Sequence, residues 1–125
     1  MESISPNIFV RNMNETIEFY KILGFSVSMS VPEDGPDYVW AMMTNGKVTM
    51  MFQTFESLGE DMPDISRGSG GSLLLYIDVK NIRGFFEEIK DNVTVLAGLD
   101  KTFYGATEFS IRDNNGYVLT FAENE

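Results

Sequence analysis

The sequence predicts an α+β fold made of two tandem βαβββ modules, and two observations carry this prediction. Asn45-Gly46 and Asn115-Gly116 each separate two short runs of apolar and β-branched residues, and Asn-Gly is a pair typical of tight hairpin turns. Each hairpin also follows a strand pattern and a helix pattern. These two patterns align at an offset of 69 positions, as Val10 and Val79 do. One module is therefore expected to occur twice.

Residues 1–125 are expected to form a single domain that contains both modules. Module one covers about residues 4–53, a linker covers 54–71, and module two covers about 72–123. A chain of 125 residues with 43% hydrophobic and 22% charged residues is long and apolar enough to bury a core.

The first module begins with a strand and a capped helix. Residues 4–11 contain an apolar run after Pro6, and proline is tolerated near the start of a strand. Asn12 is expected to cap the helix, with Glu15 three residues later as in a capping box. Gly24 is expected to end the helix in the left-handed conformation.

The rest of the first module is predicted to be strands. Apolar residues alternate with serines over residues 25–31, which predicts a half-buried strand with its serines on the other face. The hairpin over residues 38–53 completes the module. Residues 54–71 then carry four glycines and four acidic residues. This composition indicates either a plain surface connection or a flexible flap.

The second module repeats this order. An apolar strand is expected at residues 72–79, and Asn81 is expected to cap the following helix. A strand at 93–96 and a turn at 98–102 lead to the last hairpin at 104–123. The buried stripe of the helix is expected to consist of Ile82, Phe85, Phe86 and Ile89.

The composition excludes several functions. Nine Lys and Arg against nineteen Asp and Glu give a net charge of −10, so nucleic acid and anionic membranes are not expected as partners. The acidity serves either solubility or the attraction of a cationic ligand. The chain has no histidine and no cysteine, which excludes an imidazole base, a thiolate nucleophile and metal sites built from either residue.

The expected location is the cytoplasm. No apolar run approaches the roughly 20 residues that a membrane helix needs. The N-terminal residues Met1 to Ile4 lack the basic start and apolar core of a signal peptide.

Two motifs resemble those of a known superfamily. Phe19-Tyr20 and Leu23-Gly24-Phe25 are similar to an FYxxxLGF helix ending, and residues 108–116 are similar to an EFxVRDPDGN hairpin in which Asn114 replaces the proline. Over residues 4–123 the chain thus resembles the glyoxalase, bleomycin-resistance and extradiol-dioxygenase superfamily, also called vicinal oxygen chelate. The resemblance implies two modules whose mixed sheets curve into an open cup, often completed as a homodimer.

The resemblance also implies where a metal would bind. Metal-dependent members hold a divalent ion with His, Gln and Glu side chains. The corresponding positions in this sequence are Ser5, Met50, Leu74 and Thr120. None of these is a usable ligand for a hard or borderline cation. The chain is therefore similar to the metal-free bleomycin-resistance branch, which sequesters a ligand without transforming it, and no cofactor is expected.

On the same register, aromatic and apolar side chains are expected to line the cup. The expected ligand-binding residues are Phe9, Tyr38, Trp40, Met50, Phe52, Tyr76, Glu108, Arg112 and Thr120. The residues expected to pack on the helices instead are Ile8, Val10, Met51, Leu119 and Phe121. Aromatic faces attract cations and Glu108 adds a full charge, so the expected ligand is cationic or aromatic. For each aromatic residue the alternative is a place in the core or a dimer interface.

Glu108 has two interpretations. It either pairs with Arg112 on the same strand face or anchors a ligand, and it is the one candidate for a catalytic base. The favoured function is a homodimeric binding protein for a small molecule. The alternatives are a glyoxalase-like lyase or isomerase, a dioxygenase with a divalent metal, and a domain that serves only dimerisation.

Overall fold

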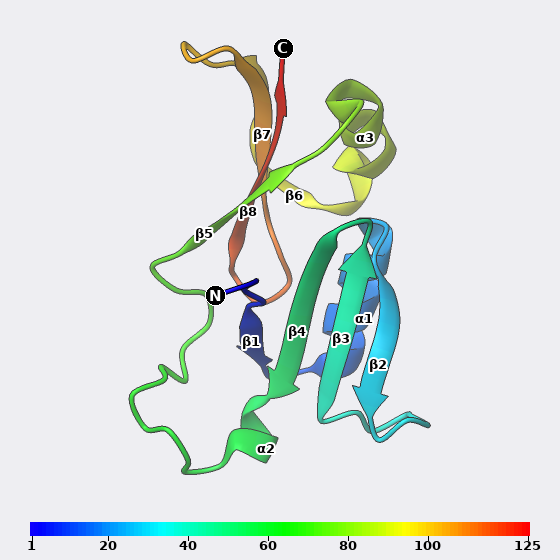
Figure 1. The fold of residues 1–125 in the computed structure, drawn as a ribbon, viewed down its shortest axis with the longest axis vertical. Helices are drawn as coiled ribbons and strands as arrows, with labels where there is room; N and C mark the ends of the chain where they lie inside the picture. The colour runs from blue at the N-terminus through cyan, green and yellow to red at the C-terminus, as the bar shows by residue number, and fades with distance from the viewer. The chain divides into compact units, whose positions relative to one another are not determined.

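The computed structural model describes residues 1–125 and divides into two compact units, residues 1–68 and 69–125. Each unit contains one four-stranded sheet and one main helix, as Figure 1 shows. The order of elements in each unit includes strand, helix and three strands. The predicted α+β class and its two βαβββ modules are therefore confirmed. No helix is both long and apolar enough to cross a membrane.

The first unit has a mixed sheet with one helix packed on it. Its elements are β1 (Asn7–Val10), α1 (Met13–Ile22), β2 (Ser26–Val31), β3 (Trp40–Asn45), β4 (Val48–Thr54) and the short α2 (Phe55–Leu58). The strand order is β1-β4-β3-β2, with β1 parallel to β4 and the other pairs antiparallel.

Helix α1 begins and ends as its sequence predicts. Asn12 Oδ1 accepts a hydrogen bond from the Glu15 amide at 3.0 Å, which satisfies one of the free N–H groups of the first turn. Gly24 has φ +94° after the last turn. The helix buries Tyr20 completely, and its ring lies 4.7 Å from that of Phe52 in β4. This contact ties the helix to the centre of the sheet.

Strand β2 differs from its predicted half-buried state. Met29 is 59% exposed and Val31 is 51% exposed, so neither is part of the core. A register irregularity between Val27 and Met29 places Met29 opposite Met42. Because β2 is an edge strand, only one side of its backbone is paired.

The second unit repeats the architecture. Its elements are β5 (Leu74–Asp78), α3 (Ile82–Ile89), the 3₁₀ turn η1 (Lys90–Asn92), β6 (Thr94–Lys101), β7 (Ala106–Arg112) and β8 (Val118–Asn124). The strand order is β5-β8-β7-β6. The predicted turn at 98–102 is wrong, because β6 continues through Gly98 to Lys101.

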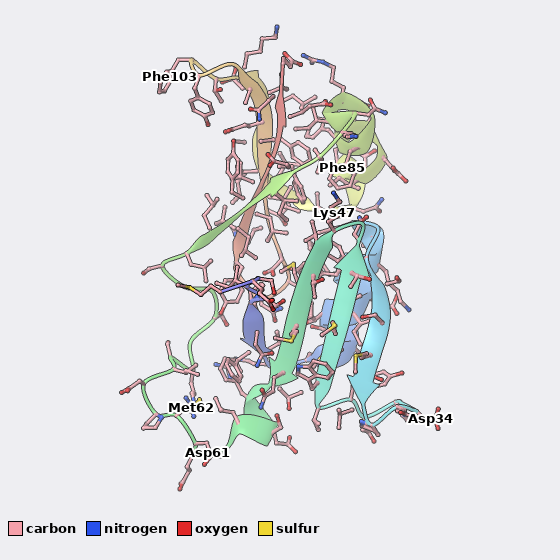
Figure 2. All side chains as sticks on the ribbon, in the orientation of Figure 1. Asp34, Lys47, Asp61, Met62, Phe85 and Phe103 are labelled. Atoms are coloured by element: carbon pink, nitrogen blue, oxygen red, sulfur yellow. The ribbon has the colours of Figure 1, made fainter.

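Aromatic rings form the core between α3 and its sheet. The Phe85 and Phe121 rings are 5.0 Å apart, and those of Phe86 and Phe109 are 4.9 Å apart. Figure 2 shows Phe85 on this helix. Ile82 is also fully buried, so the predicted apolar stripe of the helix is confirmed.

The second hairpin turns differently from the tight Asn-Gly turn in the sequence prediction. Arg112 pairs with Val118, which leaves five residues in the turn. Asp113 Oδ1 accepts hydrogen bonds from the amides of Asn115, at 2.9 Å, and Tyr117, at 2.8 Å. A side chain that accepts hydrogen bonds from the backbone amides of the next few residues favours this turn conformation.

Helix α3 is capped by a distant residue. The prediction of Asn81 as the side-chain cap is wrong, because Asn81 adopts the left-handed conformation at φ +54° and its side chain makes no cap hydrogen bond. Instead, the Glu123 carboxylate accepts from the amides of Asn81 and Ile82, each at 3.0 Å. Negative charge at a helix N-terminus is favourable as well.

Replacing Glu123 by Ala is expected to lower the free energy of unfolding by about 1–2 kcal/mol, because two N–H groups of α3 lose their acceptor. Urea unfolding measures this change. The control is Asn81→Gly, which keeps the left-handed backbone and removes a side chain without a cap bond. A larger loss from Asn81→Gly than from Glu123→Ala would contradict this assignment.

The segment predicted as a linker at 54–71 is more structured than its composition indicates. It begins with helix α2, and the loop after it wraps around the guanidinium of Arg67. That group donates hydrogen bonds of 2.6–3.0 Å to the carbonyls of Gly59, Asp61, Met62 and Ile65. Arg11 Nη2 in turn donates to the Arg67 carbonyl at 2.6 Å. One side chain thus holds the whole loop together.

Replacing Arg67 by Ala is expected to open this loop and to make residues 59–66 the first site of proteolytic cleavage, because four backbone carbonyls lose their donor. Limited proteolysis followed by mass spectrometry locates the cut. Arg83→Ala, at an exposed position of α3, is the control. Equal cleavage of both variants within 59–66 would show that Arg67 does not hold the loop.

Candidate functional site

The sheet of the first unit has one face that no helix of this unit covers. Register places Phe9, Gln53 and Trp40 side by side across β1, β4 and β3. The next row on the same face contains Asn7, Met51 and Met42. All six are at least partly exposed. We call these six side chains the aromatic face of the first unit.

Two residues predicted to line this face lie on the opposite side. Met50 is 2% exposed and Phe52 is fully buried, and both share the side of the sheet on which Tyr20 packs. The predicted face of β4 is therefore wrong, and Met51 takes the open position. Ile8 and Val10 are buried as predicted.

The length of the turn explains this error. In the first unit Asn45 pairs with Val48 across a two-residue turn, whereas the turn between Arg112 and Val118 has five residues. The two turns differ by an odd number of residues. Aligning the two Asn-Gly pairs in the sequence therefore places β4 one residue out of register with β8. A shift of one residue moves every side chain of a strand to the other face.

Further aromatic contacts lie beside Phe9. Its ring is 6.2 Å from that of Phe55 in α2, and the Arg11 guanidinium lies over Phe55 at 5.3 Å. Asn7 Nδ2 donates to Gln53 Oε1 at 3.0 Å. This bond ties the two amide side chains of the face together, and the other four side chains of the face are aromatic or apolar.

Tyr38 lies in a separate, more polar groove of the first unit. This groove has a volume of about 440 Å³ and is lined by residues from the start of α1, from the segment before β3, and from the end of β4 and α2. Among them are Asn12, Asp37, Tyr38, Thr54 and Glu56. Trp40 is not part of its lining. Tyr38 and Trp40, which were predicted to act together, therefore belong to different surfaces.

The sheet of the second unit also has a face without a helix. Register places Tyr76, Thr120 and Ser110 in one row and Leu74, Val118 and Arg112 in the next. Leu119 and Phe121 lie on the opposite side and are buried, as predicted. Thr120 is only 5% exposed, and its hydroxyl lies 2.7 Å from that of Ser110.

Glu108 lies on this face with two tyrosines. Tyr76 Oη donates to Glu108 Oε2 at 2.5 Å, and Tyr104 Oη donates to the same oxygen. The ion pair with Arg112, one of the two interpretations of Glu108 from the sequence, does not form; the Arg112 side chain is exposed. Tyr104 comes from the loop between β6 and β7. Its neighbour Phe103 is fully exposed and is labelled on this loop in Figure 2. Sequence reasoning missed Tyr104 and Phe55 as site residues.

The Glu108 carboxylate changes the acidity of both phenols. Its hydrogen bond raises the pKa of Tyr76 well above the ordinary value of 10.0, with partial desolvation adding to the effect. The pKa of Tyr104 is raised for the same reasons. Since the folded pKa values are raised, this contribution to stability is present below about pH 10 and is lost as the pH rises above it.

Glu108→Gln is expected to lower the pKa of Tyr76 towards its ordinary value, because the acceptor of its proton loses its charge. Ultraviolet titration of tyrosinate absorbance measures this change, and Tyr76→Phe assigns the transition. Glu88→Gln, at an exposed position of α3, removes one charge elsewhere in the same unit and is expected to leave the transition in place. An unchanged titration in Glu108→Gln would show that the carboxylate does not hold the phenols.

The positions that the resemblance assigns to a metal do not fit a divalent ion. With the corrected register they are Ser5, Met51, Leu74 and Thr120, and exchanging Met50 for Met51 leaves a thioether in the set. Hydroxyl, thioether and alkyl groups are poor ligands for the cations of this chemistry. In neither unit do three carboxylates, imidazoles or thiolates lie close enough together to hold a metal ion. We derive no catalytic step through a metal.

Two repeated units, each a mixed four-stranded sheet with one helix-covered and one uncovered face, define a paired βαβββ protein. A family profile described as the Glyoxalase/Bleomycin resistance protein/Dioxygenase superfamily matches residues 4–121. The chain therefore belongs to this superfamily.

Solved structures share the fold at low sequence identity. A protein of unknown function from Agrobacterium tumefaciens has a TM-score of 0.79 and 23% identity, covering 100% of this chain and 95% of that one. A superfamily enzyme from Burkholderia phytofirmans has a TM-score of 0.77 and 20% identity, and the match covers 97% of each chain. A bleomycin-binding protein in complex with bleomycin has a TM-score of 0.67 and 19% identity, and the match covers 100% of both chains. No curated protein sequence matches the chain.

Proposed function

We propose that the protein binds a small flat or cationic molecule on the aromatic face of the first unit and releases it unchanged. The observation that carries this proposal is the position of Trp40, partly exposed in one row with Phe9 on a sheet face without a helix. Aromatic rings with few free polar groups are typical of small-molecule sites. The fold shared with a protein crystallised with bleomycin supports a binding role.

Thermal unfolding in the presence of flat aromatic and cationic compounds tests this proposal. A ligand that binds only the folded state raises the unfolding midpoint as its concentration rises. We expect at least one such compound among polycyclic aromatic cations. A panel in which no such compound changes the midpoint, even at millimolar concentration, would argue against the proposal.

We propose further that the binding function needs no metal. The support is chemical: the four positions that the resemblance assigns to ligands offer two hydroxyls, a thioether and an alkyl chain. Elemental analysis of the purified protein is expected to find no stoichiometric zinc, nickel, manganese or iron. One equivalent of any of these metals would instead favour a lyase or a dioxygenase.

We also propose that the protein is a homodimer. Apolar side chains are exposed on one edge strand of each sheet, for example Met29 of β2 and Leu96 of β6. Exposed edges favour pairing with a second copy. Light scattering is expected to give twice the chain mass of 14.1 kDa. The mass of a single chain at every concentration would contradict the dimer.

A further inference from the structure

The hydrogen bonds around Glu108 leave a distinctive set of free groups. Each tyrosine hydroxyl carries one hydrogen, and both Tyr76 and Tyr104 donate theirs to Glu108 Oε2. The other carboxylate oxygen, Oε1, forms no hydrogen bond or ion pair. Towards an incoming molecule, all three side chains therefore offer only acceptors. We call them the Glu108 cluster.

The cluster is accessible from solvent. The Tyr76 and Tyr104 side chains are 52% and 55% exposed, and Glu108 is half-buried between β8 and β6. A molecule in solvent can thus contact both tyrosine side chains without any rearrangement of the sheet.

The surroundings of the cluster are negative. Asp78, Ala122, Glu108 and Asp100 form one row across β5, β8, β7 and β6 on the same face. Ala122 is buried and small, so it does not separate the carboxylates with a bulky side chain. Arg112, the basic residue of β7 on this face, lies two rows away. This field attracts cations and repels anions.

We propose that the Glu108 cluster is a binding site for a primary ammonium group. Three N–H donors of an –NH₃⁺ group match three acceptors: Glu108 Oε1 and the two phenol oxygens. The two aromatic rings beside it add cation–π attraction. The proposal rests on the proposed function only in taking the ligand to be a cation.

The same geometry disfavours other cations. A quaternary ammonium has no N–H and forms none of the three hydrogen bonds, so only its charge and its cation–π contacts favour binding. A guanidinium prefers to bind both oxygens of a carboxylate at once, but Oε2 already accepts two hydrogen bonds. The cluster is therefore selective for the type of cation as well as for its charge.

A matched series of benzyl compounds tests this selectivity on the full chain. The probes are benzylammonium, benzyltrimethylammonium, benzylguanidinium and benzyl alcohol, and chemical shifts of the amides at residues 76, 104 and 108 measure binding. We expect saturable shifts with benzylammonium and an affinity at least about tenfold higher than that for either other cation, because the loss of even one charge-assisted hydrogen bond costs this much. Benzyl alcohol is expected to bind most weakly.

Substitutions test which residues bind benzylammonium. Glu108→Gln is expected to lose at least about tenfold in benzylammonium affinity, while Glu88→Gln, on the exposed side of α3, keeps it. Tyr104→Phe, in an exposed loop, removes one acceptor without touching the core and is expected to weaken binding several-fold. Equal binding of benzylammonium and benzyltrimethylammonium would overturn the proposal. Unchanged affinity in Glu108→Gln, or shifts confined to other residues, would do so too.

The test is separate from that of the proposed function. If flat aromatic compounds fail to bind at Trp40 but benzylammonium shifts the amides of the cluster, the proposed function fails alone. If a ligand binds at Trp40 and no primary ammonium binds at Glu108, the further inference fails alone.

Discussion

Replacing Phe52 by Ala is expected to lower the free energy of unfolding by about 3–5 kcal/mol. The ring is fully buried and lies 4.7 Å from that of Tyr20, on the helix-covered side of the central strand β4. Removing it loses the transfer energy of a large aromatic group and leaves a cavity under α1. A loss of this size is a large part of the about 5–15 kcal/mol that stabilises a typical domain.

Met51→Ala is the matched control, because it truncates the neighbouring residue on the open face of the same strand. Its expected cost is below about 1 kcal/mol, since the side chain is already partly exposed. Urea unfolding of both variants gives the two free energies. If Met51→Ala lowers the free energy of unfolding as much as or more than Phe52→Ala, the register predicted from the sequence, with Phe52 on the ligand side, would be correct.

Replacing Trp40 by Ala is expected to weaken the ligand identified by thermal unfolding about 100-fold, or by about 2–3 kcal/mol. The indole supplies the largest stacking surface of the aromatic face, and its partial exposure allows it to contact a ligand. Isothermal calorimetry measures the affinity. Trp40→Phe is expected to recover part of the loss, because a ring remains on the face.

Phe103→Ala is the control for Trp40→Ala. It removes a fully exposed aromatic side chain from the second unit, and the affinity is expected to stay within about twofold. An affinity that survives Trp40→Ala would remove the aromatic face of the first unit from the binding site, whatever the ligand proves to be.

Local sequence signals were sufficient for most of the fold. Asn12, the cap of α1, lies only three residues before Glu15, whose amide it bonds. The apolar stripe of α3 follows from helical spacing. Repetition of these patterns at a fixed offset identified the two modules. Such features depend on neighbours in the chain, which is why a single sequence contains them.

The errors involve features that local patterns do not fix. The faces of β4 depend on a turn of two residues in one module and five in the other. The cap of α3 comes from Glu123, which is 42 positions from Asn81. No local sequence pattern indicates a partner that lies so far away in the chain.

The candidate site was predictable to a similar extent. Alternation along β7 placed Glu108, Ser110 and Arg112 on one face of the sheet, and their register agrees with this. One of the two sequence interpretations paired Glu108 with Arg112, but the two tyrosines hold the carboxylate instead. Tyr104 reaches Glu108 because β6 extends to Lys101 and the turn follows it. A strand predicted to end at residue 96 gave no reason to expect that contact.

The fluorescence of Trp40 gives the most direct test of ligand binding on the aromatic face. Trp40 is the only tryptophan of the chain, so its emission reports on this one position. We predict that a ligand that raises the unfolding midpoint also changes this emission saturably, with the same apparent dissociation constant. A stabilising ligand that saturates the protein and leaves the Trp40 emission unchanged would contradict the account.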